Sequence, residues 1–206
     1  METYDEVKPQ SLFSRFVRNG TWQCPTLTVL RSLSRLDDPR IFNDDRLRYI
    51  PKDLRPYWGP RSTSPWNTIS TQNRASLKIQ SRESTKLVGR MYRAGVGILA
   101  GTDALNPYCF PGFSLHDELA LLVEAGLSPM AALQAATSNA ARFMGQSDRR
   151  GTIETGKTAD LVLLDKDPLA DIHNTLSIRA IVIGGKLIPR TALDATLKEA
   201  AALASK

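Results

Sequence analysis

The chain has 206 residues, 42% of them hydrophobic and 7% aromatic, which suffices to bury the core of one domain, or of one domain with an appendage. Its apolar runs are only a few residues long, far below the roughly 20 that cross a bilayer, so we expect no membrane partner. The net charge of +6 is uneven, because residues 1–100 hold 17 Lys and Arg against 9 Asp and Glu.

This basic first half raises the possibility of a nucleic-acid surface. Its arginines are scattered among prolines and acids, without the interleaved aromatic side chains on which bases stack. We therefore favour an ordinary solvated surface and expect no nucleic-acid partner. A steep salt dependence of duplex binding would support the alternative.

The segment Met1–Glu6 is acidic where a secretory signal would be basic and then apolar. Cys24 and Cys109 are the only cysteines, too few for a disulfide framework and without the paired spacing of a zinc ribbon. A reducing cytoplasm is the expected location.

The first third of the chain alternates between regular and irregular sequence. Apolar residues at helical spacing predict a helix within residues 3–18, which Asn19-Gly20 ends. Residues 21–30 favour a strand that ends in a bend at Pro25. Residues 37–66 are dense in proline, which indicates an insertion of about 37–70 that serves as a lid, forms short helical turns or meets a partner.

The middle of the chain has the pattern of a covered parallel strand between helices. Helix-forming residues predict a helix over 71–94, closed by Gly95. The run from Gly95 to Leu99 is apolar without polar alternation, which is typical of a strand that helices cover on both faces. A helix over 115–125 follows.

The last part changes from helices to hairpins. Ser128 is expected to be the N-cap of a further helix, with Pro129 in its first turn. Residues 137–139 are expected to break this helical region. Residues 159–164 and 180–183 resemble strands, and Gly184-Gly185 predicts a tight hairpin after the second. An Ala-rich helix closes the chain over 191–206.

Asp103 is the most informative position. It directly follows the predicted strand, behind the small residues Gly101 and Thr102. In α/β barrels such a carboxylate projects from the carboxyl end of a strand, where it can bind a metal or accept a proton. It can equally cap a turn or the next helix, and spacing alone does not separate these two roles.

Several runs, in this order, resemble the C-terminal third of the amidohydrolase superfamily, and its imidazolonepropionase-like and peptidase-like branches in particular. They are GILAGTDA (97–104), the segment from SLHDEL to ARFMG (114–145), GTIETGKTADLVLLDKDPLADI (151–172) and IRAIVIGGKLI (178–188). RNGTWQCPTLTVL (18–30) also resembles the seventh barrel strand of that group.

The resemblance implies an α/β fold: the C-terminal part of a TIM-like (β/α)8 barrel, about strands 7 and 8 with their helices, plus part of a small β-sandwich and a C-terminal helix. Residues 1–146 would form the partial barrel and residues 147–206 the sandwich segment and closing helix. The implied reaction is hydrolysis of a carbon–nitrogen bond in a non-peptide amide, cyclic amide or dipeptide by metal-activated water. Asp103 would both bind the metal, expected to be zinc, and take the proton from the water.

The two histidines have other expected roles. His116 falls in the family's Leu-His-x-Glu-Leu stretch, where capping or packing at a helix start is favoured over a substrate contact. His173 is expected on the surface or in a turn.

The sequence also departs from the family pattern, because a complete member has a His-x-His pair and further histidines on earlier strands. Neither histidine here lies in such a pair or precedes Asp103. One aspartate cannot hold zinc, since a catalytic site needs about three protein ligands. We therefore expect the chain to be inactive alone and to bind zinc only when a missing N-terminal half completes the site.

Open strand edges and an uncovered apolar face further favour association, either with that missing barrel half or in a homo-oligomer. A small-molecule amide is the expected substrate of the complete enzyme. The alternative is a catalytically silent subunit that uses the half-barrel as a docking surface.

Overall fold

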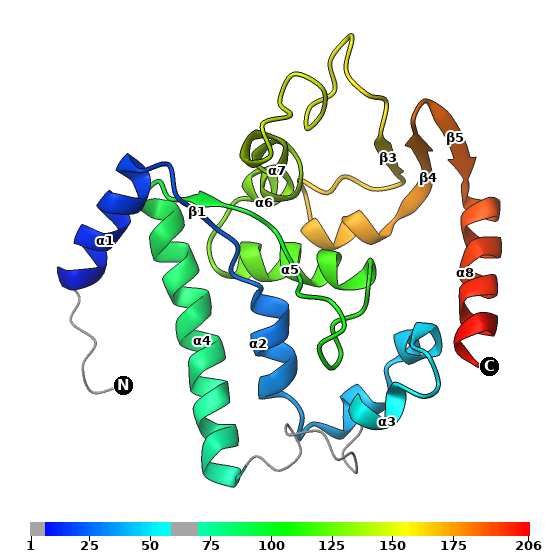
Figure 1. Cartoon of the computed structure of the whole chain (residues 1–206), viewed down its shortest axis with the longest axis horizontal. Coiled ribbons are helices and arrows are strands. Elements are labelled where there is room, and N and C mark those ends of the chain that lie inside the picture. The colour runs from blue at the N-terminus through cyan, green and yellow to red at the C-terminus, as the bar shows by residue number, and fades with distance from the viewer. Residues whose placement is uncertain (1–6, 59–69) are drawn as a thin grey trace.

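The computed structural model describes residues 7–58 and 70–206 (Figure 1). The predictions for residues 3–6 of the first helix and for residues 59–69 of the insertion lie outside the described residues. Within the described ranges, helices pack around a two-stranded parallel sheet, and a three-stranded antiparallel sheet lies toward the carboxyl end. The α/β class predicted from sequence is confirmed.

The chain begins with α1 (Val7–Arg18), followed by β1 (Trp22–Gln23) and α2 (Leu27–Ser34). The strand ends before Pro25, in agreement with the predicted bend. The residues after the bend form α2, which the sequence did not predict, because Thr, Val and Leu at these positions suit a strand as well as a helix.

The described part of the insertion consists of short helical turns. They are the 3-10 helices η1 (Pro39–Asn43) and η2 (Asp45–Tyr49) and the single-turn helix α3 (Arg55–Trp58). Aspartate side chains begin both 3-10 helices by accepting a hydrogen bond from a backbone N–H two residues on. Of the three roles considered for the insertion, short helical turns is the one observed here.

The long helix α4 (Thr71–Arg93) leads into β2 (Gly97–Ile98). Ser70 caps α4 by accepting a hydrogen bond from the backbone N–H of Asn73. The two strands pair in parallel, with Trp22 opposite Gly97 and Gln23 opposite Ile98. The parallel pairing predicted from the covered apolar run is therefore present, although it spans only these two residue pairs.

Three helices follow: α5 (Phe113–Glu124), α6 (Pro129–Ala136) and α7 (Ser138–Phe143). Ser128 accepts a hydrogen bond from the backbone N–H of Ala131, so the predicted N-cap is confirmed. The helical region breaks at Thr137, also as predicted, because its backbone leaves the helical conformation there.

The carboxyl-terminal part contains β3 (Leu161–Leu164), η4 (Ile172–Leu176), β4 (Ile178–Ile183), β5 (Lys186–Pro189) and α8 (Arg190–Ala204). The sheet order is β3-β4-β5, antiparallel throughout. Gly184 and Gly185 both have positive φ, the conformation that a two-residue type I′ hairpin requires. The predicted hairpin and closing helix are confirmed.

Two clusters of buried side chains form the core. The larger one joins α1, α2, α4, β2, α5 and α6, and α5 runs through its middle (Figure 1). The smaller one joins α2 and the insertion to the segment after β2, and its buried aromatic side chains are Trp58, Tyr108 and Phe110. The hydroxyl of Tyr108 donates a 2.8 Å hydrogen bond to the carbonyl of Trp58, so the insertion is anchored beside the end of β2. Across residues 7–58 and 70–206, no helix is both long and apolar enough for a membrane crossing.

Candidate functional site at the carboxyl ends of the parallel strands

The carboxyl ends of β1 and β2 lie side by side. The backbone N–H of Leu99 donates a 2.8 Å hydrogen bond to the carbonyl of Gln23, which extends the pairing beyond the strands. Gly101 lies so close to Cys24 that a Cβ on the glycine would be 2.3 Å from the cysteine sulfur. The glycine two residues before Asp103 therefore leaves room for the Cys24 side chain at the end of β1.

Backbone strain is concentrated in the two segments that follow these strands. Four non-glycine residues of the described ranges have positive φ: Thr26 at 46°, Asp103 at 48°, Leu105 at 79° and Tyr108 at 61°. Thr26 follows β1, and the other three follow β2. L-residues rarely adopt this conformation, and such strain gathers at binding and catalytic sites where the surrounding structure holds it in place.

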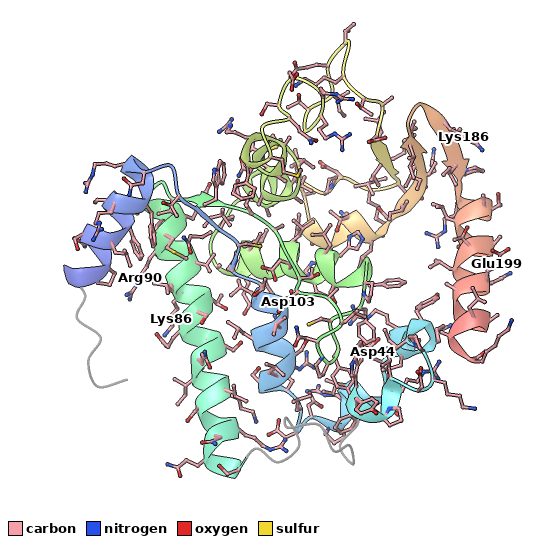
Figure 2. All side chains as sticks on the ribbon, viewed as in Figure 1. Asp44, Lys86, Arg90, Asp103, Lys186 and Glu199 are labelled. Carbon is pink, nitrogen blue, oxygen red and sulfur yellow. The ribbon has the colours of Figure 1, made fainter. Side chains whose placement is uncertain are left out.

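Asp103 lies in the loop between β2 and α5 with its side chain exposed (Figure 2). Its backbone carbonyl accepts a 3.0 Å hydrogen bond from the Asn106 side chain, which closes a turn. Within residues 7–58 and 70–206 its carboxylate has no hydrogen-bond or ion-pair partner. The carboxylate is thus free to contact an incoming group, while the backbone that carries it is held in place.

The neighbouring Cys24 thiol offers different chemistry. Partial burial and the negative charge of Glu118 raise the pKa of Cys24, so the thiol stays protonated at neutral pH. Since the thiolate is the nucleophilic form, Cys24 is not activated for covalent catalysis.

Glu118, in the middle of α5, is fully buried, and its carboxylate caps the N-terminus of α2. It accepts hydrogen bonds from the backbone N–H groups of Leu27 (3.1 Å) and Thr28 (2.8 Å), and from the Thr28 hydroxyl (2.6 Å). The N-cap residue Thr26 makes no side-chain capping bond of its own. Glu118 therefore takes over the capping role and fixes the turn between β1 and α2.

His116 and His173 lie on facing elements, α5 and η4. The Nδ1 atom of His116 is 3.0 Å from the Thr175 hydroxyl, and burial lowers the pKa of this imidazole. This contact is the packing role that the sequence favoured for His116. His173 is exposed and pairs with Asp171 at 2.8 Å, so the surface position expected for it is confirmed.

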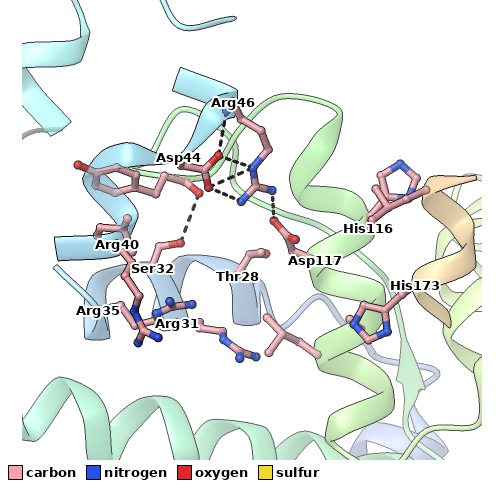
Figure 3. Close-up of a pocket in the computed structure, with 15 residues that line it drawn as sticks. Thr28, Arg31, Ser32, Arg35, Arg40, Asp44, Arg46, His116, Asp117 and His173 are labelled. Atoms are coloured by element: carbon pink, nitrogen blue, oxygen red, sulfur yellow. Dashed lines mark hydrogen bonds and ion pairs between the residues drawn. The ribbon is translucent and has the colours of Figure 1, made fainter. Parts of the chain in front are cut away.

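Both histidines line a cavity of about 290 Å³, between α2, the 3-10 helices of the insertion and α5 (Figure 3). Arg46 lies at one wall, where it contacts Asp44 at 2.8 Å and Asp117 at 2.6 Å and stacks 4.5 Å above the Phe110 ring. Burial alone would raise the pKa of Asp44, but the hydrogen bonds from Arg46 lower it below its ordinary value. Asp103 is not among the lining residues, so the cavity and the strand ends are distinct features.

The described residues by themselves do not fit a metal ion. In residues 7–58 and 70–206, no three histidine, cysteine, aspartate or glutamate side chains are arranged to hold one. A zinc site normally takes about three protein ligands, and the strand ends offer the single carboxylate of Asp103.

Sequence reasoning missed Glu118 and Arg46 as positioning groups. The signal for Glu118 was present, because an acid lies on the apolar face of α5 among Leu119, Leu121 and Leu122. An unpaired acid in that position is rare and implies a partner. For Arg46, the nearby Asp44 was visible in the sequence, but the second partner, Asp117, is 71 residues away and gave no local signal.

Comparisons with known proteins place the chain in a family. The model of the amidohydrolase family matches residues 63–188. Imidazolonepropionase from Aromatoleum aromaticum is 38% identical over 108 residues, which are 48% of this chain and 24% of that protein. Ochratoxinase from Aspergillus niger is 37% identical over 118 residues, which are 55% of this chain and 24% of that protein. The matches span about a quarter of the length of these relatives.

Solved structures agree with the fold. Bottromycin amidohydrolase superposes with a TM-score of 0.71 at 24% identity, covering 90% of this chain and 40% of that one. A Xaa-Pro dipeptidase superposes with a TM-score of 0.62 at 22% identity, covering 86% and 36%. The family match and the sequence relatives confirm the resemblance to the amidohydrolase superfamily, with imidazolonepropionases among the sequence relatives and a peptidase among the structural neighbours.

Proposed function

Because the chain belongs to the amidohydrolase family, we propose that it supplies the last barrel strands of a hydrolase that cleaves carbon–nitrogen bonds. The substrate class is a non-peptide amide, a cyclic amide or a dipeptide. Asp103 is the catalytic residue in this proposal: its carboxylate takes a proton from the attacking water and hands it to the departing nitrogen.

The observation that supports this proposal is the concentration of strained backbone at the carboxyl ends of β1 and β2. A carboxylate that only capped a turn would not need three positive-φ residues around it. Strain of about 1–3 kcal/mol per residue persists only where the fold overdetermines the conformation, and it is typical of sites that hold a group ready for a ligand.

In the finer architecture that we propose, β1 and β2 are strands 7 and 8 of a (β/α)8 barrel, and α4 and α5 are two of its outer helices. Residues 1–146 belong to the barrel and residues 147–206 to the sandwich segment and closing helix. β3, β4 and β5 then form part of the small β-sandwich. The open edges of the parallel pair are consistent with further strands beside them.

The family is generally metal-dependent, and zinc is the metal that we propose. When bound, it would activate the attacking water. Asp103 would be one ligand, and the histidines would come from barrel strands outside these 206 residues, which a partner chain or a longer polypeptide can supply. Without them the 206 residues are proposed to be inactive. The substrate contact considered for His116 stays a prediction.

The test is hydrolysis of N-acyl amino acids, dipeptides and cyclic amides by the chain combined with a histidine-bearing amidohydrolase barrel half. We expect turnover that Asp103→Asn reduces by about a thousandfold or more, as for loss of a general base together with a ligand. Asp148→Asn changes an exposed aspartate in another segment and serves as the control.

Equal activity of the Asp103→Asn and wild-type complexes would contradict the role of Asp103. A stable complex without any turnover would instead point to a silent subunit that uses the half-barrel for docking.

A further inference from the structure

The helix α4 carries a regular row of basic side chains. They recur at four-residue intervals as Arg74, Lys78, Arg82, Lys86 and Arg90, and Glu83 is the one acid of the helix. Successive members of the row are neighbours on the helix surface with a rise of about 6 Å, and each step turns about 40° around the axis, so the row winds along α4. Figure 2 shows Lys86 and Arg90 on this helix.

Part of this row faces α2 across a groove of about 540 Å³. The lining contains the five cationic side chains of Arg31, Arg35, Lys78, Arg82 and Lys86. It also contains the carboxylate of Glu124 and the hydroxyl groups of Ser34, Ser81 and Thr85. A second cavity of about 340 Å³, lined by Lys86, Arg90 and Arg93, adjoins it at Lys86 and Glu124. We call the cavity of about 540 Å³ the α2–α4 groove.

The carboxylates near the groove do not fully compensate its cations. Three of the cations form ion pairs, Lys78 with Asp37, Lys86 with Glu83 and Arg31 with Glu124, and in each pair both side chains are about half exposed. Exposed pairs of this kind contribute little to stability, so an incoming anion can replace the carboxylate.

The remaining two cations are less engaged. Arg82 has no ion-pair partner within the described ranges of the chain. Among the described residues, the Arg35 side chain makes one hydrogen bond, of 3.2 Å, to Asp38, whose carboxylate also accepts bonds from the Arg40 side chain. Donors of both guanidinium groups thus remain available at the groove.

This chemistry suits a ligand with several phosphate groups. Guanidinium forks match the oxygen geometry of phosphate, ammonium groups bind it as point charges, and hydroxyls add neutral donors. The lining itself holds five cations against one carboxylate, Glu124, which favours a ligand with more than one negative charge. A groove of several hundred Å³ is also the size at which proteins enclose small ligands.

We propose that the α2–α4 groove binds a small anion carrying two or more phosphate groups. The groove shares no lining residue with the strand ends that carry Asp103, so this proposal stands apart from the hydrolase proposal. It assigns a role to the basic excess of residues 1–100, which the composition alone left as a solvated surface.

The test is a calorimetric titration of the purified chain, with any partner it retains, by inorganic triphosphate at about 0.15 M salt, where exposed charges are screened. We expect saturable binding that Arg35→Gln and Arg82→Gln each weaken about tenfold, the loss typical of one charge-assisted hydrogen bond. Arg18→Gln removes the same charge from α1 and should leave the affinity unchanged.

A second measurement does not depend on folded variants. Triphosphate should slow acylation of Lys78 and Lys86 by an amine-reactive reagent, as located by mass spectrometry, and leave Lys198 of α8 unaffected. The proposal is overturned by an absence of saturable binding, or by equal losses in the Arg18→Gln and groove variants. It is also overturned if a DNA duplex binds more tightly than triphosphate with the same dependence on Arg35 and Arg82.

Discussion

The carboxylate of Glu118 accepts a 2.8 Å hydrogen bond from the backbone N–H of Thr28, although 90 residues separate the two. This bond joins the middle of α5 to the first turn of α2, directly behind the carboxyl end of β1. The turn that carries Thr26 is thereby fixed against α5, the helix that follows the loop with Asp103.

Replacing Glu118 by alanine should destabilise the fold strongly. The change leaves two backbone N–H groups and one hydroxyl buried without an acceptor, and we expect the free energy of unfolding to fall by about 3 kcal/mol. Urea unfolding of the purified chain measures this. Glu124→Ala, on the exposed end of the same helix, removes only a surface ion pair and should cost less than about 1 kcal/mol. Equal losses in the two variants would show that Glu118 does not cap α2.

Gly101 and Cys24 should show energetic coupling. A methyl group at position 101 would overlap the Cys24 sulfur, so Gly101→Ala should force the Cys24 side chain or the strand ends to shift and cost about 1–3 kcal/mol. Cys24→Ala removes the sulfur and should recover part of that loss in the double variant. A double-mutant cycle of unfolding free energies tests the contact, and strict additivity would contradict it.

Stability should depend on pH through His116. Burial lowers the pKa of its imidazole in the folded chain, whereas the unfolded value is about 6.5. Between these two values the unfolded chain binds more protons, so stability rises with pH there. The contribution is complete above about pH 6.5 and is lost as the pH falls through the folded pKa. An NMR titration of the His116 ring should give a midpoint below 6.5, and a higher midpoint would rule out the neutral packed imidazole.

Arg46 should anchor the insertion through its planar guanidinium. Arg46→Lys keeps the charge but loses the fork toward Asp44 and Asp117 and weakens the stacking on Phe110, so we expect a loss of about 1–2 kcal/mol. In a thermal melt this corresponds to a midpoint lower by about 2–8 °C. Arg40→Lys changes a far more exposed arginine, 84% against 30% accessible, and should shift the midpoint little. A similar shift in both variants would indicate that Arg46 acts only as a surface charge.

The sequence predictions were confirmed where the stabilising interaction joins residues close together in the sequence, and they failed where it joins distant residues. Ser128 caps a helix that starts at the next residue, and Gly184-Gly185 forms a two-residue turn, so both signals are local and both predictions are confirmed. Helix α2 was missed because its cap comes from Glu118, far along the chain. The position of Asp103 after a strand was predictable, but the approach of Gly101 to Cys24 depends on the register between β1 and β2, which no local pattern specifies.

The metal content of the purified chain, alone and in complex with a histidine-bearing barrel half, tests the central claim most directly. The account predicts no stoichiometric zinc in the isolated chain, because Asp103 is a single ligand, and stoichiometric zinc in the complex that falls when Asp103 is replaced by asparagine. Stoichiometric zinc in the isolated chain, retained after that replacement, would contradict it.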